Sequence, residues 1–374
     1  MRVIDEQGRL FGLINVIDAL AVLFALAVVA AGVALVFSGE SEQESELDTR
    51  YVTLDLGTQP DYVTERIDAG DVASPSNAPG NLTITDVYVT PTGDGAVSVT
   101  ARARINGRLQ DQSNRASPVF TFAGTSLVLG QQLTVRTDEY SISGTVTAVA
   151  SDGESLDITT TNVVMEYSLP ADIASDLSVG DRYRLNGETL ATIESKRVYP
   201  GNTPFNRRVY LGLSLRTLTQ EDRTQFGGRP VRPGNDFRLV FEPYDITGTV
   251  RELGRSSLRG EVTTTTAVVE LSDVSPERAR NVRAGLTETV GGTQYAEITD
   301  VRSEPSEVVL TSDDGNISLR EHPRNVDLSL TVELRTRQRD TGLRFHGDPL
   351  RLNDQIVLNF DFLTVRGVLI EVRT

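Results

Sequence analysis

The sequence contains no cysteine and no tryptophan, and its only histidines are His322 and His346. Without cysteine the chain forms no disulfides and has no thiol chemistry, so its stability must come from packing and ions. A zinc site would need clustered ligands at short spacing, and none is visible. We therefore predict no metal and no cofactor, and we expect both histidines to be solvated loop residues.

Sequence motifs for catalysis are missing as well. The chain has no nucleophile elbow, phosphate-binding loop or zinc-binding helix motif. The many acidic residues offer accidental carboxylate pairs, but a catalytic pair should be unique to one cleft. An enzyme is therefore the least favoured hypothesis, and we predict a non-catalytic protein.

Positive charge is scarce and almost all of it is arginine. The chain has 52 acidic and 36 basic residues, a formal net charge of -16, and Lys196 as its single lysine. Such a surface repels nucleic-acid phosphates, so we predict no nucleic-acid binding. At about 1 M salt the Debye length is only about 3 Å, which screens the self-repulsion of this charge. The composition predicts adaptation to concentrated salt, although a genome that favours arginine codons would also explain the use of arginine in place of lysine.

One hydrophobic run stands near the N-terminus. Residues 13–37 are apolar except for Asn15 and Asp18. About 20 apolar residues are needed to cross about 30 Å of hydrocarbon as a helix. A cleaved signal peptide has a shorter apolar core, of about 7–15 residues. The run therefore predicts a transmembrane helix over residues 13–37 that anchors the chain in membrane lipid.

The distribution of arginines predicts the orientation of this helix. Arg2 and Arg9 precede the run, and the next basic residue is Arg50. The positive-inside rule therefore predicts a cytoplasmic N-terminus at residues 1–12 and an extracellular remainder. Residues 38–49 are acidic and polar, which is typical of a solvated linker. We expect a single-pass cell-membrane protein with extracellular C-terminal domains.

The region after the linker repeats itself. Three segments that begin at Phe122, Phe226 and Phe345 align without gaps. Their shared glycines predict tight turns and close backbone approach within strands. The turn glycines are Gly124, Gly228 and Gly347, and the strand glycines are Gly144, Gly248 and Gly367. A second turn is predicted where Gly130, Gly234 and Asn353 tolerate a positive φ.

The repeats predict three tandem domains at residues 50–150, 160–253 and 262–374. Apolar residues alternate with period two over most of each copy, as in half-buried strands. One short helix is expected in each copy, ended by a C′ glycine at Gly70, Gly180 or, less clearly, Gly285. The predicted fold class is mainly β: one N-terminal transmembrane helix, then three small β-barrel or β-sandwich domains, each with a short helix.

The N-terminal stretch has a recognisable pattern, Ile-Asp-x-x-Gly-x-Leu-Phe-Gly-x-Ile-Asn-x-Ile-Asp, over residues 4–18. This pattern resembles the opening of domain-of-unknown-function family 4330, and the repeated Gly-Asp turn and closing Gly-Val strand resemble the soluble part of that family. The resemblance is specific at the N-terminus and looser in the repeats. It implies membrane anchoring and an envelope location, but no activity and no catalytic residues. With the acidic composition, we expect a halophilic archaeal type with a triplicated domain.

Several residues remain as candidates for contact. Asn15 and Asp18 are candidates for contact with a membrane partner. Arg223, Arg229 and Arg232 could bind an anionic glycan or a lipid head group, although charge balance on an acidic surface also explains them. The sequons at Asn81 and Asn316 are compatible with glycosylation. Residues 313–316 are expected to form a hairpin turn.

Two functional hypotheses follow from these observations. The leading one is a structural or interaction protein of the cell envelope, with envelope proteins as partners. The alternative is a binding module for surface polysaccharide, or an accessory subunit of an export or assembly complex. Oligomerisation is compatible with both.

Overall fold

The computed structural model describes residues 9–10, 14–15, 21, 23–30, 47–75, 80–93, 95–110, 118–201, 203, 205–311, 317–360 and 362–373. Near the N-terminus, β1 (Arg9–Leu10) pairs with β2 (Ile14–Asn15), and residues 23–30 are helical. No helix among these residues is long and apolar enough to cross a membrane. Much of the predicted span at residues 13–37, including Asp18, lies outside the described residues.

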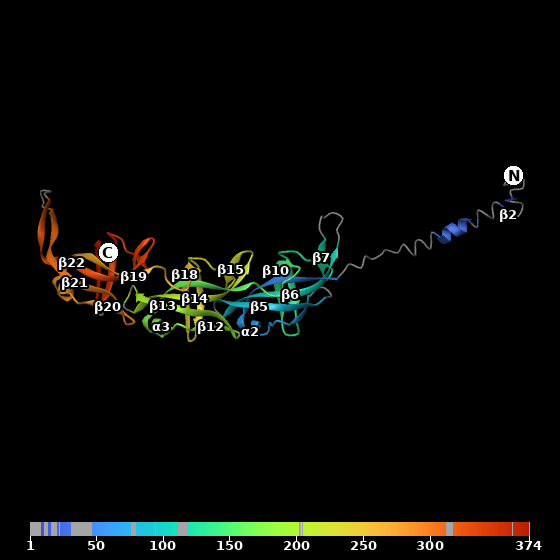
Figure 1. The fold of residues 1–374 in the computed structure, drawn as a ribbon, viewed down its shortest axis with the longest axis horizontal. Helices are drawn as coiled ribbons and strands as arrows, with labels where there is room; N and C mark the ends of the chain where they lie inside the picture. Colours follow the sequence, from blue (N-terminus) through green and yellow to red (C-terminus); the bar gives the residue numbers. More distant parts are fainter. Residues whose placement is uncertain are drawn as a thin grey trace.

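The rest of the described chain is mainly β and forms three eight-stranded sheets that lie in a row along the long axis of the molecule (Figure 1). The first sheet extends from residue 47 to residue 150, the second from 158 to 253 and the third from 261 to 373. Only residues 151–157 and 254–260 connect them. The prediction of a mainly β fold is confirmed.

The three sheets are built from the same order of elements. The first contains β3 (Leu47–Pro60), α2 (Asp61–Thr64), β4 (Val72–Pro75), β5 (Leu82–Gly93), β6 (Ala96–Gln110), β7 (Val119–Phe122), β8 (Thr125–Ser126), β9 (Gln132–Arg136) and β10 (Ser141–Ala150). The second contains β11 (Ile158–Pro170), α3 (Ala171–Asp176), β12 (Arg182–Leu185), β13 (Glu188–Pro200), β14 (Asn206–Gln220), β15 (Arg223–Phe226), β16 (Arg229–Pro230), β17 (Asp236–Phe241) and β18 (Tyr244–Leu253). The third contains β19 (Glu261–Val274), α4 (Pro276–Asn281), β20 (Thr287–Val290), β21 (Thr293–Thr311), β22 (Ile317–Arg339), β23 (Gly342–Phe345), β24 (Asp348–Pro349), β25 (Gln355–Phe360) and β26 (Leu363–Arg373).

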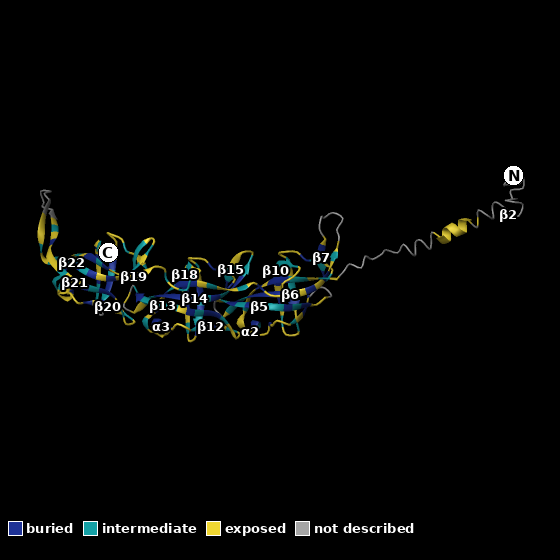
Figure 2. Ribbon diagram, in the orientation of Figure 1, coloured by how far each residue is buried: buried dark blue, intermediate teal, exposed yellow. Residues whose placement is uncertain are grey.

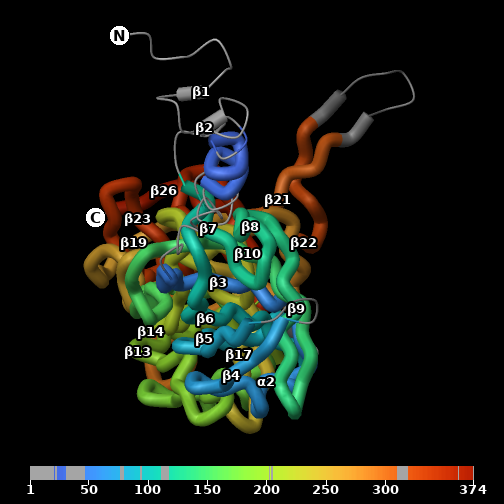
Figure 3. Tube along the Cα trace, turned by 90° about the vertical axis from the view of Figure 1, so that its right-hand side faces the viewer, coloured from blue at the N-terminus to red at the C-terminus, as the bar shows by residue number. Residues whose placement is uncertain are grey.

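Each sheet curls around a core of its own. In the first sheet the order is β3-β10-β9-β4-β5-β6, and β6 pairs back with β3, which closes a ring of six strands. In the second and third sheets the end strands contact each other without a ladder, β12 beside β17 and β20 beside β25, giving a barrel-like arrangement. The apolar residues of period two point inward, and Figure 2 shows the buried residues inside each sheet. The end-on view in Figure 3 shows the sheets stacked behind one another.

The glycines that the sequence aligned have the predicted geometry. Gly124, Gly228 and Gly347 have φ of +78°, +67° and +94°, and each is the second residue of a two-residue hairpin turn. The residue before each also has a positive φ, as a type I′ turn requires. The predicted positive φ at Gly130, Gly234 and Asn353 is confirmed.

The strand glycines mark places where a neighbouring strand comes very close. A Cβ at Gly144 would lie 2.6 Å from Leu56, and one at Gly367 would lie 2.5 Å from Val269. A Cβ at Gly248 would overlap the ring of Tyr167. The predicted close approach is therefore confirmed in all three sheets, and side chains of the first strand of each sheet fill the space that each glycine leaves.

The short helices are present, but the expected cap is not. α2 ends at Thr64 and α3 at Asp176, several residues before Gly70 and Gly180. These glycines instead occupy the third position of β-turns, closed in the second sheet by the bond from Asp181 N to Ser178 O. The positive φ was correctly expected, but it serves the return into the next strand and not the end of the helix.

The far end of the third sheet differs from the corresponding ends of the other two. β21 and β22 continue past Pro305 as a projecting two-stranded ribbon, which Figure 1 shows at the end of the row. At its base, Asp327 Oδ1 accepts hydrogen bonds from Ser306 Oγ at 2.7 Å and from Asp273 N at 2.8 Å. The polar groups at the base of the ribbon therefore find their hydrogen-bond partners within the third sheet.

Candidate functional site at the junction of the second and third sheets

The sheets meet through a repeated contact, in which the type I′ hairpin of one sheet packs on the end of the preceding sheet. At the first junction, Gly227 N of the β15–β16 turn donates to Thr90 Oγ1 at 3.1 Å. The turn lies so close that a Cβ on Gly227 would be 2.5 Å from Pro91 O. Tyr88 adds a hydrogen bond from its hydroxyl to Arg216 O at 2.7 Å. The absence of a side chain at Gly227 is thus a requirement of this contact.

The second junction uses the β23–β24 hairpin in the same way. A Cβ on Gly347 would overlap the hydroxyl of Tyr210, so the turn lies directly against that ring. Arg208 Nη1 donates to His346 O at 3.2 Å, and Tyr295 Oη donates to Val198 O at 2.8 Å. Both bonds join the second sheet to the third.

The connecting segments are also held. Arg102 Nε donates to Gly153 O at 2.9 Å, and its Nη2 donates to Asp152 O at 3.1 Å. At the second junction Ser195 Oγ donates to Ser256 O at 2.5 Å. A Cβ on the adjacent Gly212 would overlap Ser256 O, so the backbone of the connection lies directly on β14. Both connections are therefore packed on the sheet that they leave.

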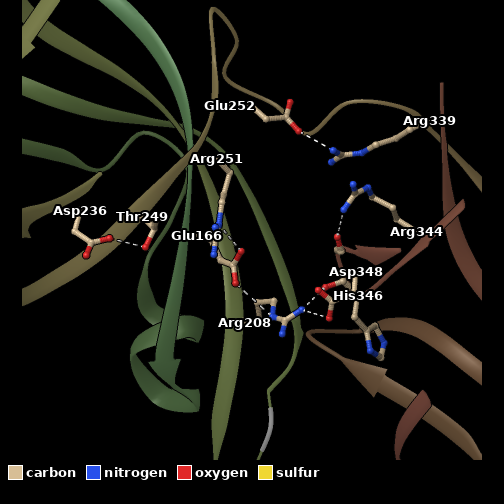
Figure 4. A network of polar contacts seen from close by, with 11 residues as sticks. Glu166, Arg208, Asp236, Thr249, Arg251, Glu252, Arg339, Arg344, His346 and Asp348 are labelled. Carbon is tan, nitrogen blue, oxygen red and sulfur yellow. Dashed lines mark hydrogen bonds and ion pairs between the residues drawn. The ribbon is translucent and has the colours of Figure 1, made fainter. Parts of the chain in front are cut away.

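Ion pairs reinforce the second junction, as Figure 4 shows. Arg208 lies 3.5 Å from Glu166 within its own sheet and 2.5 Å from Asp348 of the third sheet. Burial lowers the pKa of Arg208, but the hydrogen bond and charge of Asp348 outweigh it, so the pKa is raised overall. Glu252 lies 2.9 Å from Arg339, again across the junction. The pair of Glu252 and Arg339 is largely buried, so salt screens it less than the pair with Asp348, whose side chain is mostly exposed.

A histidine and a buried glutamate meet at this junction. His346 Nε2 lies 2.9 Å from Glu288 Oε2, although the angles do not fit a hydrogen bond and neither atom has another partner among the described residues. Glu288 is fully buried, and its Oε1 accepts from Asn359 N at 2.7 Å. The imidazole ring stacks on Phe345 with ring centres 3.7 Å apart and contacts Tyr199.

Both residues depart from what the second sheet has at the same places. Glu288 pairs with Ala296 in the ladder, where Tyr183 pairs with Ala191 in the second sheet. His346 occupies the first turn position, where the second sheet has Gly227. The expectation that His346 is a solvated loop residue was wrong, because the hairpin that carries it is docked against another sheet. His322 lies in β22, where its Nδ1 accepts from Asn325 N at 2.8 Å.

A pocket of about 260 Å³ opens beside this pair, which we call the junction pocket. Pro200 and Gly201 of the second sheet form one side, and the outer face of β25 and β26 forms another. Its polar lining includes Arg208, Arg351, Gln355, Asn359 and Arg366. Ligand sites are commonly found between domains, usually at about 300–1,000 Å³, so this pocket is near the small end of that range.

The arginines singled out in the sequence do not line this pocket. Arg223 begins β15, Arg229 follows the hairpin turn, and Arg232 precedes β17; all three are exposed. Arg229 Nη1 donates to Asp236 O at 3.4 Å. No contact that joins the three is seen among the described residues. Asn81 is exposed and its Oδ1 accepts from Ser74 Oγ at 3.0 Å, whereas Asn316 and residues 313–315 lie outside the described residues.

Sequence reasoning missed the residues of the junction pocket. Arg351 corresponds to Arg232 in the gap-free alignment, and Arg366 stands one residue before Gly367. Nothing in the alignment indicated that these positions face another sheet. One signal was available, since Glu288 places a carboxylate in the inward register of a strand. Among the described residues no group of three or more His, Cys, Asp or Glu could hold a metal ion.

Comparison with known proteins gives a partial match. No curated protein and no solved structure matches the chain. The model of the family described as a domain of unknown function, DUF4330, matches residues 1–150. The match covers the N-terminal segment and the whole first sheet, so this part of the chain is similar to that family.

Proposed function

We propose that the protein is a membrane-anchored, extracellular structural and interaction protein of the cell envelope, without catalytic activity. The helix over residues 13–37 anchors it with its N-terminus in the cytoplasm, and three domains of one kind extend outward. The observation that carries this proposal is the repeated junction, in which a docked hairpin and a packed connection hold each sheet to the next. Such contacts favour a stiff row over loosely strung domains.

The acidic composition supports the view that this row works in concentrated salt, as a halophilic protein. A stiff row holds partners at a defined distance from the membrane. The partners would be other envelope proteins, for which exposed surface at the far end of the row is available. The exposed Val309 and Leu319 on the projecting ribbon are examples of such surface.

The proposal is tested on intact cells in their native salt. A photo-activated cross-linker placed at Leu319, on the far ribbon, is compared with one at Leu47, at the start of the first sheet. Distinct envelope-protein adducts at the two positions are expected. Protease added outside should remove the three domains and leave a short membrane fragment. Protection of the domains in cells whose other surface proteins are cleaved would overturn the topology, and an absence of protein adducts at both positions would overturn the scaffold function.

The polysaccharide-binding alternative has one favourable observation, the junction pocket with its arginines.

A further inference from the structure

Two arginines of the junction pocket have charges without a counter-ion. Arg208 is engaged by Glu166 and Asp348. By contrast, the side chains of Arg351 and Arg366 make no ion pair and no hydrogen bond with any residue that the structure describes, and both residues are exposed at the pocket. On a chain with a net charge of -16, two unneutralised guanidinium groups facing one cavity are unusual. The whole lining holds three arginines against two aspartates, so the pocket keeps a net positive charge that attracts an anionic group.

The two arginines are placed by neighbouring strands. Arg366 lies on the outer face of β26, opposite Val357 of β25. Arg351 lies in the turn before β25, and that turn is tied to β26 by the bond from Asn353 N to Leu369 O at 2.8 Å. Their backbones are therefore fixed by a ladder and a turn. A guanidinium group offers a planar fork of donors that matches a carboxylate or a sulfate.

The remaining lining suits a polar ligand. Gln355 and Asn359 of β25 both line the pocket and contribute side-chain amides to it. Asn359 Nδ2 reaches Gly201 O at 3.5 Å, and its Oδ1 accepts from Thr364 Oγ1 at 3.0 Å, so this amide is oriented. The rings of Phe345 and His346 add an aromatic wall. Amide and guanidinium donors beside an aromatic ring fit a sugar that carries a negative charge.

The first junction also has pockets, of about 600 Å³ and about 580 Å³, but they are lined by other strands. At the first junction β17, the counterpart of β25, lies against β5. At the positions of Arg351 and Arg366, the second sheet has Arg232 and Thr247. The pair of arginines beside β25 and β26 thus has no counterpart in the second sheet.

We propose that the junction pocket binds one acidic sugar unit of an extracellular polysaccharide, with Arg351 and Arg366 holding its carboxylate or sulfate. This site deepens the polysaccharide-binding alternative and rests on the proposed extracellular location of the domains, but it does not depend on the scaffold function. Binding requires both sheets, because Pro200 and Gly201 of the second sheet line the pocket together with residues of the third. The protein thereby binds a charged glycan at a fixed position, between its second and third sheets.

The test uses the full-length protein and isothermal titration calorimetry at two salt concentrations. The probes are trigalacturonate, a sulfated galactan oligosaccharide, neutral maltotriose and inorganic sulfate. Saturable binding of one of the two acidic oligosaccharides, and not of maltotriose, is expected, and the pair distinguishes a carboxylate from a sulfate. Binding should weaken at the higher salt concentration, because the attraction is ionic. The proposal is wrong if neither acidic oligosaccharide binds. It is also wrong if inorganic sulfate binds as tightly as the acidic oligosaccharide, because the site then holds an adventitious ion only.

Matched variants locate the site. Arg351→Ala and Arg366→Ala should each weaken binding at least about tenfold, since hydrogen bonds to charged groups are among the stronger ones. Arg302→Ala is the control, because this exposed arginine of β21 lies outside the pocket and pairs with Asp300. Unchanged binding in the double variant Arg351→Ala/Arg366→Ala would overturn the assignment. Arg351→Lys/Arg366→Lys keeps the charge without the fork and separates lost folding from lost recognition, since partial binding is expected there.

Discussion

Single atoms decide how the sheets meet. Gly124 and Gly347 occupy the same turn position and share a positive φ, but they face different surroundings. A Cβ at Gly124 would meet nothing within 4 Å, whereas one at Gly347 would overlap Tyr210. Alanine substitutions at the two glycines therefore allow two costs in unfolding free energy to be told apart. Gly124→Ala has only the cost of a positive φ, whereas Gly347→Ala also disturbs the junction.

We predict that Gly347→Ala destabilises the protein more than Gly124→Ala. Both variants lose about 1 kcal/mol because alanine disfavours a positive φ. Gly347→Ala adds an overpacking cost of about 1–3 kcal/mol at the junction. Chemical unfolding in native salt measures both variants. Equal losses of unfolding free energy would show that the hairpin is not packed against Tyr210.

The buried pair of Glu288 and His346 yields a second prediction at this scale. His346→Ala keeps the backbone conformation, since Ala123 has a φ of +54° at the same position. It removes the imidazole nitrogen that faces Oε2 of the fully buried Glu288, and a buried polar atom left without a partner costs about 1–3 kcal/mol. The double variant Glu288→Gln/His346→Ala should recover part of this loss, because the amide carries no charge and its Oε1 still accepts from Asn359 N. A double variant no more stable than the single one would contradict the pairing.

Among the elements, β6 holds the connection between the first two sheets through one buried side chain, beside contacts from β3 and β5. Arg102 binds Asp152 O, Gly153 O and Thr53 Oγ1, and it is almost fully buried. We predict that Arg102→Ala makes residues 151–157 sensitive to limited proteolysis while the sheets stay folded. Arg104→Ala is the control, because Arg104 is half exposed and lies 3.7 Å from Glu154. Equal cleavage of the two variants would show that the connection is held by other contacts.

A pH dependence is expected at the hydrogen bond between β21 and β13. Burial raises the pKa of Tyr295 to about 12, and its hydroxyl donates to Val198 O. The unfolded chain ionises this phenol near its ordinary value of about 10. The folded state therefore binds the proton more tightly, so its contribution is complete below about pH 10 and is lost as the pH rises toward 12. In Tyr295→Phe, unfolding experiments should show a smaller fall in stability across that window; an unchanged fall would exclude Tyr295 as its source.

The elements also show what could be predicted from the sequence. Turn glycines and period-two strands report local geometry, so Gly347, Gly248 and Gly234 were assigned correctly. The helices were expected, but Gly70 and Gly180 were misassigned as caps because a positive φ serves a β-turn as well as a helix end. Contacts between sheets produce no local pattern in the sequence. Arg351 and Arg366 look like ordinary surface residues until the docked hairpin places a second sheet opposite them.

For the whole molecule, charge is the governing property. With a net charge of -16, self-repulsion opposes the compact state when salt is low. We predict that the melting temperature rises steeply between about 0.1 M and about 1 M KCl, where the Debye length falls from about 10 Å to about 3 Å. Sucrose at matched osmolality is the control, since it favours burial without screening charge. A melting temperature equally raised by sucrose, or independent of KCl, would contradict haloadaptation.

The bare turn at Gly227 has a consequence for how such a chain is assembled. The end of the first sheet leaves only 2.5 Å between Pro91 O and a Cβ at that place, whereas the second sheet receives the imidazole of His346 between aromatic rings. The turn residue of each sheet therefore fits only the sheet that precedes it. If the second and third sheets exchanged positions in the chain, His346 would pack against the first sheet, where there is room only for glycine. The units are not interchangeable, and their order along the chain is written into the shape of their contacts.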